Sequence, residues 1–401
     1  MTPQNDDTAP AGPLSGVLVA DFSRVLAGPY ATMLLGDLGA TVVKVERPGS
    51  GDDTREWGPP YAHGQSTYFQ AVNRNKRSIA LDLADLGDRA VALALCRRAD
   101  VVIENFRPGT TERVGLGYEH VRAANPRTVY CSITGFGRAD GAHLAGYDLL
   151  VQAVGGLMSV TGTDAAHPTK VGVALVDVIT GLHACVGIQA AMRHRDATGE
   201  GQRVEVDLLS SLLSALTNQT SAYLNAGVVP QAMGNRHPSI APYEVFHARD
   251  RPLVLAVGND RQFAALCATL DLPGLGRDER FATNAARVAH RSELVAALEG
   301  ALARGDAGTW VERLGARGVP CGLINRVDEA IAFAEQIGLA PTVDLPADPA
   351  DPEGGSSRQV RHPITLSSSP AGYRSGPPRL PEAASARAVL ADLGIDLPDG
   401  A

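Results

Sequence analysis

One aspartate, Asp177, stands where an apolar segment gives way to a long amphipathic helical pattern. The run Gly172 to Arg195 reads GVALVDVITGLHACVGIQAAMRHR, so the carboxylate would lie among the first amides of a helix. A carboxylate with a reference pKa of about 3.9 is ionised at pH 7 and can attack an acyl group without a general base. Asp is also a preferred helix N-cap, and position alone favours that structural role.

Glycine-rich loops could supply donors for the oxyanion that develops during acyl transfer. Backbone amides often perform this role, and glycine lets the backbone approach a ligand closely. Turn formation is the structural alternative for each of these glycines. The candidates are Gly135, Gly137, Gly155 and Gly156.

The composition is typical of a metabolic enzyme that binds small molecules. Of 401 residues 44% are hydrophobic, enough for two domains or one elaborate domain. A formal net charge of −8 argues against general binding to nucleic acid or to an anionic membrane. Basic residues cluster at Arg74, Lys76 and Arg77, and this patch suits a small phosphorylated ligand better than a polymer.

The cysteines and the N-terminus indicate a cytoplasmic protein without a metal site. Five cysteines lie far apart without zinc-site spacing, so we expect buried thiols in a reducing compartment. The start, MTPQNDDTAPAGP, lacks the features of a signal peptide, and we expect a disordered tail over 1–12. No stretch approaches about 18 uninterrupted apolar residues, so no membrane span is expected.

The elements that must position this chemistry indicate a parallel α/β fold. Apolar runs at 17–22 and 41–45, separated by a helical pattern at 30–38, predict a β-α-β unit. Short β-branched runs at 101–104 and 129–133 repeat the theme, each ending in a polar or glycine-rich loop. Because strand ends line the ligand crevice of open α/β sheets, we expect the site in these loops.

A second group of elements follows a strand at 202–207 and a helix at 208–224. It predicts a smaller α/β domain, followed by a linker rich in Pro, Gly, Asp and Ser at 341–358 and a closing helix at 383–393. The elements of the smaller domain are strands at 253–257 and 319–324 and helices at 260–270, 291–303 and 309–316.

Ordered blocks along the chain carry a resemblance to a known family. They are ADFSRVLAGPY (20–30), LGDLGATVVKVERPGSGD (35–52), NRNKRSIALDL (73–83), ENFRPGTTERVGLGY (104–118), SITGFG (132–137), GYDLLVQAVGGLMSVTG (146–162), GNRHPSIAPYEVF (234–246) and VGNDRQF (257–263). In this order they resemble the class III CoA-transferase family, also called the carnitine dehydratase and bile-acid-inducible F family. So many blocks are far more specific than one short motif.

The resemblance implies that coenzyme A moves from an acyl-CoA donor to a carboxylic acid acceptor, with Asp177 as the covalent nucleophile. It implies a mixed aspartyl anhydride and then an aspartyl-CoA thioester. Both are prone to hydrolysis, so the site must exclude water. No metal and no tightly bound cofactor are implied, because the CoA thioester is itself a substrate.

The resemblance also implies which residues contact the substrates. The phosphates of CoA call for basic side chains and exposed amides. The CoA contacts would be Val25, beside the pantetheine arm, and Arg47, Lys76, Asn105, Phe106 and Arg113. Further candidates for substrate or oxyanion contacts are Gly135, Tyr147 and Gly156. Substrate contacts from the small domain and its partner chain would be Met233, Asn235, Arg236, His237 and Tyr243.

For the architecture, the resemblance implies a Rossmann-like open parallel sheet in a large CoA-binding domain over 13–222. A small α/β domain would cover 223–330, and 331–401 would comprise a linker and a return to the large domain. Two chains would form an interlocked homodimer.

A racemase that epimerises 2-methylacyl-CoA is the alternative within the family. That branch uses a histidine in a G-H-D motif, whereas this chain has Tyr147 in GYD. A phenol with a pKa of about 10 is a poor partner for α-proton transfer, which favours the transferase. Asp260 falls near the racemase glutamate and keeps the alternative open, while His183 suits the core better than catalysis.

Three departures from formyl-CoA transferases narrow the range of expected substrates. Leu26 and Thr134 replace their glutamine and lysine, and their tetraglycine loop is missing, which argues against formyl or oxalyl specificity.

Overall fold

The computed structural model describes residues 12–346, 357–382 and 385–397, which form two compact units. The large unit comprises Met1–Leu157, Val171–Val228 and Ala340–Ala401, and the small unit comprises Met158–Lys170 and Val229–Leu339. The expected tail at 1–12 lies, apart from Gly12, outside the described residues.

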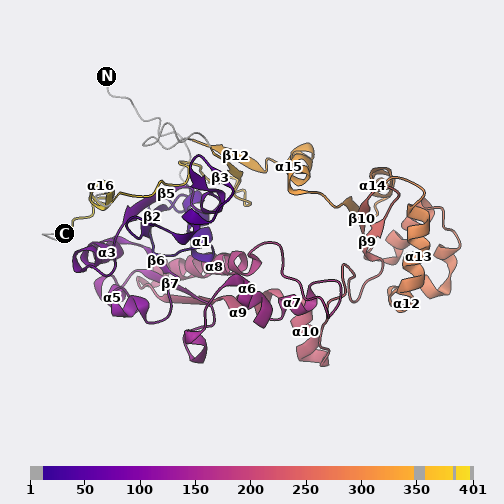
Figure 1. Ribbon diagram of the computed structural model, residues 1–401, viewed down its shortest axis with the longest axis horizontal. Coiled ribbons are helices and arrows are strands. Elements are labelled where there is room, and N and C mark those ends of the chain that lie inside the picture. Colours follow the sequence, from indigo (N-terminus) through magenta and orange to yellow (C-terminus); the bar gives the residue numbers. More distant parts are fainter. Residues whose placement is uncertain (1–11, 347–356, 383–384, 398–401) are drawn as a thin grey trace, which may run out of the picture. The chain divides into compact units, whose positions relative to one another are not determined.

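The large unit is built on a six-stranded parallel sheet (Figure 1). Counted along the chain, the strand order is 3-2-1-4-5-6, the order of doubly wound folds, which reverses between β1 and β6. In spatial order the strands are β5 (Lys76–Ala80), β2 (Thr41–Glu46), β1 (Leu18–Asp21), β6 (Val101–Glu104), β7 (Val129–Thr134) and β8 (Arg203–Asp207).

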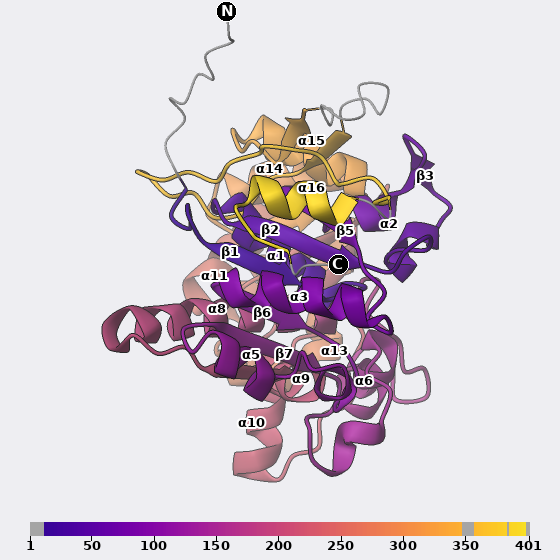
Figure 2. The ribbon, with the colours of Figure 1, turned by 90° about the vertical axis from the view of Figure 1, so that its left-hand side faces the viewer.

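Helices cover both faces of this sheet, so its strands are apolar on both sides. Along β1, Val19 packs into the core beneath one helix layer and Ala20 into the core beneath the other. The first layer contains α1 (Ala27–Asp37), α8 (Leu175–Thr198) and α9 (Leu208–Ala215). The second contains α3 (Leu86–Arg98), α5 (Tyr118–Ala124) and α16 (Ser385–Asp392), which face the viewer in Figure 2.

The helix α8 is long and apolar enough to cross a membrane by length and composition. Its position in the sheet layer explains that hydropathy, because Val176, Ala184 and Ile188 are buried in the core. Gly181 lets α8 approach α1 closely, since a Cβ there would lie 2.7 Å from the Ala27 carbonyl oxygen. The two helices therefore begin close to one another.

The large unit contains further short elements. The helix predicted at 208–224 is divided at Thr217, whose φ is 39°, into α9 and α10 (Thr217–Ala226). The others are η1 (Asp53–Glu56), β3 (Tyr61–Ala62), β4 (Gln65–Ser66), α2 (Thr67–Gln70), α4 (Thr110–Arg113), η2 (Asp140–His143), α6 (Asp148–Val154), β12 (Thr342–Leu345) and β13 (Ser357–Val360). The helix α7 (Leu157–Val160) spans a boundary between the units.

The small unit has a three-stranded antiparallel sheet ordered β11-β10-β9. Its core includes Phe246, Leu253, Phe263, Leu298 and Trp310. The strands are β9 (Tyr243–His247), β10 (Pro252–Ala256) and β11 (Cys321–Leu323), and the helices are α11 (Asp260–Thr269), η3 (Leu275–Arg277), η4 (Glu279–Phe281), α12 (Asn284–Ala289), α13 (Arg291–Leu302), α14 (Ala307–Gly315) and α15 (Val327–Gln336).

The two units meet at 228/229 and 339/340. These boundaries differ from the expected ones at 222/223 and 330/331. Residues 158–170 belong to the small unit, and the Gly234 amide donates to the Gly162 carbonyl oxygen at 2.9 Å. The expected linker at 341–358 contains β12 and the first two residues of its antiparallel partner β13, while 347–356 lie outside the described residues. The chain then returns to the large unit, where Leu390 is buried against the sheet.

Candidate active site

A cavity of about 180 Å³ opens at the carboxyl ends of β1, β6 and β7, where the strand order reverses. Its walls come from the loops after these strands, from the segment before α6 and from the start of α8. Of the sequence-predicted site residues, those lining it are Val25, Asn105, Phe106, Gly135, Gly137, Tyr147 and Asp177.

Asp177 is the third residue of α8 and does not cap that helix. The cap position is Ala174, and the capping acceptor is Asp148 at the start of α6. One oxygen of Asp148 accepts from the amides of Val176 at 2.8 Å and Asp177 at 3.2 Å. Within the described residues, no hydrogen bond reaches the Asp177 carboxylate itself. The capping alternative for Asp177 is therefore wrong.

The environment of Asp177 changes its ionisation. Burial, and secondly the nearby Asp148 carboxylate, raise the pKa of Asp177 to about 7. At pH 7 this group is therefore less fully ionised than a carboxyl with an ordinary pKa, which differs from the expected fully ionised nucleophile. The ionised form is poorly solvated, which makes this carboxylate more reactive than one in water.

The first turn of α1 lies beside this carboxylate at the same cavity. The helix predicted at 30–38 begins at Ala27, and its cap residue, Leu26, makes no side-chain hydrogen bond. Leu26 and Ala27 both line the cavity with Asp177. The sequence analysis missed this helix start, although Pro29 in the first turn is a signal for one. Backbone amides with a helix dipole behind them favour an anion at this place.

Asn105 fixes the loops after β1 and β6 to one another. The Arg24 amide donates to the Asn105 side-chain oxygen at 2.8 Å, and the Asn105 side-chain nitrogen donates to the Arg24 carbonyl oxygen at 2.7 Å. This polar side chain lines the cavity, but both of its functional groups are used within the protein. Arg24 also lies 5.2 Å from the centre of the Phe106 ring.

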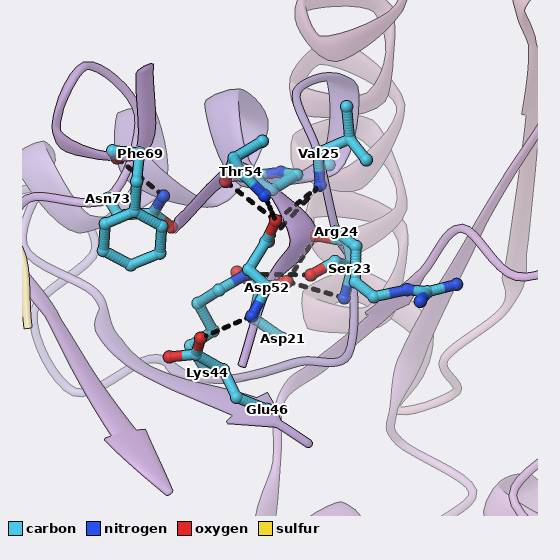
Figure 3. Close-up of polar contacts among 12 residues, drawn as sticks. Asp21, Ser23, Arg24, Val25, Lys44, Glu46, Asp52, Thr54, Phe69 and Asn73 are labelled. Carbon is cyan, nitrogen blue, oxygen red and sulfur yellow. Dashed lines mark hydrogen bonds and ion pairs between the residues drawn. The ribbon is translucent and has the colours of Figure 1, made fainter. Parts of the chain in front are cut away.

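Val25 is held in a strained backbone conformation at the cavity wall. Its φ is 68°, which is rare for a β-branched residue. Its amide donates to both oxygens of Asp52 at 3.3 Å (Figure 3). The Asp52 carboxylate also accepts from Lys44 Nζ at 2.9 Å and has no exposed side-chain surface. A buried ion pair therefore supports the wall of the site.

Lys76 belongs to the same buried network and does not line either main cavity. Its ammonium donates to Asp21 at 3.2 Å, to the Pro29 carbonyl oxygen at 2.9 Å and to Asn73 at 2.9 Å. The Lys76 and Asp21 side chains have no exposed surface. This position differs from the expected CoA contact, because the ammonium is enclosed and already has three acceptors.

A second cavity of about 190 Å³ lies beside the first, and Arg24 and Phe106 border both. Its walls include the apolar side chains of Phe22, Val45 and Leu81. Arg47 lines it, is half-exposed and forms an ion pair with Asp53. An apolar pocket with two guanidinium groups at its edge suits a ring system that carries phosphates.

The remaining glycine candidates and Arg113 differ in whether they line a cavity and in what their backbone amides bond. The Gly137 amide donates to Thr134 Oγ1 at 3.0 Å and the Gly155 amide to the Val151 carbonyl oxygen at 2.8 Å. Arg113 is exposed, and neither it nor Gly156 lines either cavity. Gly135 does line the first cavity, and its loop packs so closely that a Cβ would lie 2.4 Å from the Gly146 Cα.

Tyr147 lies at the first cavity, whereas His183 lies in the contact between two helices. Tyr147 is 64% exposed at the rim of the first cavity, directly before Asp148. His183 Nδ1 lies 3.1 Å from Ser211 Oγ, within the contact between α8 and α9.

In the small unit, the side chains considered for the acceptor make local contacts. Arg236 donates to the Met233 carbonyl oxygen at 2.9 Å, and the rings of His237 and Tyr243 pack edge to face. Asp260 forms an ion pair with Arg287 at 2.7 Å. Asn235 is exposed. Among the described parts of both units, no group of three His, Cys, Asp or Glu side chains could hold a metal ion.

Comparison with known proteins assigns the family. The model of CoA-transferase family III matches residues 14–383. The succinate–glutarate CoA-transferase of Agrobacterium fabrum is 43% identical over 95% of this chain and 96% of its own. The acetyl-CoA:oxalate CoA-transferase of Acetobacter aceti is 44% identical over 80% of this chain and 83% of its own.

A solved structure shares the fold. A CAIB/BAIF family protein from Brucella suis superposes with a TM-score of 0.83 at 40% identity, covering 96% of this chain and 100% of that one. Together with the family match, this similarity identifies the chain as a member of CoA-transferase family III and an enzyme that transfers coenzyme A.

Proposed function

We propose that this chain moves coenzyme A between an acyl-CoA and a dicarboxylic acid through a covalent intermediate on Asp177. The observation that carries the proposal is the Asp177 carboxylate, which is half-buried and without a hydrogen-bond donor at a cavity shared with the first turn of α1. The relatives from Agrobacterium and Acetobacter are named for succinate, glutarate and oxalate, which supports a dicarboxylic acceptor.

In the proposed reaction, an Asp177 oxygen attacks the thioester carbonyl carbon, and the carbon–sulfur bond breaks to release CoA thiolate. The thiolate attacks the aspartyl carbonyl of the mixed anhydride, which releases the donor acid and leaves aspartyl-CoA. The acceptor carboxylate then attacks this thioester, and the released thiolate attacks the acceptor acyl group. The product is a new acyl-CoA, and the Asp177 carboxylate is restored.

The oxyanion of each tetrahedral step needs donors beside Asp177. We assign this role to the amides of Leu26 and Ala27 at the start of α1, because both residues line the cavity and the helix dipole favours negative charge there. Gly135 is a further candidate from the opposite wall.

CoA would occupy both cavities. Its adenine ring suits the apolar pocket of Phe22, Val45 and Leu81, with Arg24 and Arg47 near the phosphates. The pantetheine arm would pass Phe106, which borders both cavities, and deliver the thioester beside Val25 and Asp177.

Mass spectrometry of the protein incubated with succinyl-CoA and no acceptor tests the proposal. A CoA adduct on the peptide containing Asp177, converted by hydroxylamine to an aspartyl hydroxamate, is expected. The Asp177→Asn variant is the control and should form none. An active wild-type enzyme whose Asp177 is never labelled, even by rapid quenching, would overturn the mechanism.

The racemase alternative receives less support. Tyr147 replaces the histidine of that branch, and the Asp260 carboxylate is engaged by Arg287. Deuterium entering the α-carbon of a 2-methylacyl-CoA without CoA exchange would favour it instead.

We also propose that the chain forms a homodimer through the apolar surface around α8. Exposed apolar side chains on α6, α8 and α10 include those of Val154 at 60%, Val186 at 67% and Leu224 at 77%. Exposed apolar surface that gathers in one region commonly marks an interface. In light scattering, Val186→Glu with Leu224→Glu should shift the mass toward that of a monomer. Leu86→Glu, at an equally exposed site on α3, is the control.

An interlocked arrangement would make subunit exchange as slow as unfolding, and rapid exchange between tagged and untagged chains would contradict it. We place the enzyme in the cytoplasm, a location that the five free cysteines support.

A further inference from the structure

Asp148, 29 residues before Asp177 in the chain, controls the backbone that enters α8. Its Oδ2 accepts from the amides of Val176 and Asp177, and its Oδ1 accepts from the Gln152 side-chain nitrogen at 2.5 Å. Gln152 is buried, and its side-chain oxygen accepts from the Val171 amide at 2.9 Å. Two side chains on one face of α6 therefore hold three amides of the segment that carries Asp177.

This contact determines which free backbone amides of the first turn of α8 remain available to the Asp177 carboxylate. An acidic side chain in the first turn of a helix ordinarily turns back to bond the free amides of that turn. Here Asp148 already occupies the amides of the second and third residues of α8. The like charges of the two aspartates also disfavour a retreat of Asp177 toward the helix start.

We propose that Asp148, supported by Gln152, is a positioning residue that caps α8 in place of Asp177 and so keeps the Asp177 carboxylate free for the thioester. The proposal rests on the proposed function, because it assigns Asp177 the role of nucleophile. Capping a helix and attacking an acyl group require the same oxygens, so this division between two aspartates lets both occur at one helix start.

The charges around Asp177 make the pH profile a sensitive measurement. Of the elements near it, α6 presents Asp148 and α2 presents Tyr68, whose pKa is raised to about 12 by burial and by the carboxylates of Asp177 and Asp148. On α1, Asp37 is paired with Arg74. Asp207, at the end of β8, caps α9 through the Ser210 amide. Tyr30 on α1 is a neutral phenol, because burial raises its pKa.

Three further charged groups, Arg24, Asp53 and Arg107, line the same cavity as Asp177. β7 and the rest of β8 carry additional titratable groups. The buried thiol of Cys131 on β7 stays neutral because burial raises its pKa, and Tyr130 on β7 donates its hydroxyl to the Leu116 carbonyl oxygen. On β8, Arg203 pairs with Glu205 at 3.1 Å. Removing the charge of Asp148 should therefore directly lower the pKa of Asp177.

Two substitutions of Asp148 separate its capping from its charge. Asp148→Ala removes the cap and lets Asp177 turn back, and we expect kcat to fall at least about tenfold with a smaller change in KM for acyl-CoA. Asp148→Asn keeps an acceptor oxygen for the two amides. We expect it to restore most of kcat and to move the acid limb of the pH profile at least about 0.5 units lower.

Asp250→Ala is the matched control for stability. Asp250 also caps a helix from outside it, accepting from the Ala307 amide at the start of α14 at 2.7 Å. It should lower the melting temperature to a similar extent as Asp148→Ala, with kcat and the pH profile unchanged.

The outcomes distinguish this proposal from the mechanism on which it rests. Wild-type kcat in Asp148→Ala, with the covalent adduct still formed on Asp177, would overturn the positioning role alone. Absence of the adduct in the wild-type enzyme would overturn both. If Asp148→Ala does not fold, Asp148→Asn decides, because an unshifted acid limb contradicts the proposal.

Discussion

The large unit holds two groups of carboxylates at the same end of its sheet, and they have opposite ionisation properties. Behind the loop after β1, Asp52 accepts from Lys44 and from Thr54, and its pKa is lowered to about 2 because these partners outweigh the effect of burial. Asp21 receives Lys76, Ser23 and Thr32, and its pKa is also lowered despite burial. At the start of α8, Asp177 has no such partner, and its pKa is raised to about 7.

Partners, rather than burial, therefore separate a structural carboxylate from a reactive one. The paired group is stabilised as an anion, and it holds the strained Val25 backbone through the amide hydrogen bonds to Asp52. The unpaired group is destabilised as an anion, which favours attack on an electrophile. One region fixes the geometry of the cavity wall, and the other holds the proposed nucleophile.

The largest expected effect is on turnover in Asp177→Asn. The amide cannot form the anhydride, so kcat should fall at least about 10³-fold, near 4 kcal/mol in activation free energy. Affinity for CoA, measured by calorimetry, should change little, because the expected CoA contacts are elsewhere. A variant with wild-type turnover would show that Asp177 is not the reactive carboxylate, and so would remove the contrast between the paired and the unpaired region.

In the paired region, Lys44→Met should destabilise the fold. It leaves Asp52 buried without its cation, and loss of one partner of a buried pair costs about 3–5 kcal/mol. Urea unfolding at pH 7 measures the loss. Arg47→Met, which removes a half-exposed ion pair at the edge of the second cavity, is the control for stability and should change it by less than about 1 kcal/mol.

The unpaired region should respond in the opposite direction, with Asp177→Asn more stable than the wild type at pH 8. A carboxyl whose folded pKa exceeds its unfolded value binds protons more tightly when folded, so wild-type stability declines as pH rises from about 4 to about 7. The variant avoids this loss, and its advantage should reach about 2–4 kcal/mol at pH 8 and vanish near pH 4. An advantage that does not change between these pH values would contradict an unpaired, half-buried Asp177.

The smallest effect is the pH dependence of the wild-type enzyme. With the ionised Asp177 as the proposed nucleophile, kcat/KM should rise with pH and reach half its plateau near pH 7. The value at pH 6 should be about tenfold below that at pH 8. A profile that is flat between pH 5 and 8 would indicate a carboxylate with an ordinary pKa.

Sequence reasoning predicted much of the parallel sheet, because β-branched runs such as 101–104 and 129–133 have a strong local signal. It did not single out the start of α1 at Ala27 or the role of Asp148. Both depend on contacts between segments far apart in the chain. The same limit explains Lys76, which reads as a surface cation but is enclosed by Asp21, Asn73 and the Pro29 carbonyl oxygen.

The sequence by itself determined that the chain has a doubly wound α/β unit, a family resemblance and an aspartate at the start of a long helix, because periodicity and motifs are local properties. Only the tertiary structure decided that this aspartate does not cap its helix and is not fully ionised at pH 7. Capping and pKa depend on which groups surround a side chain in space, and here the decisive neighbour, Asp148, comes from a different helix.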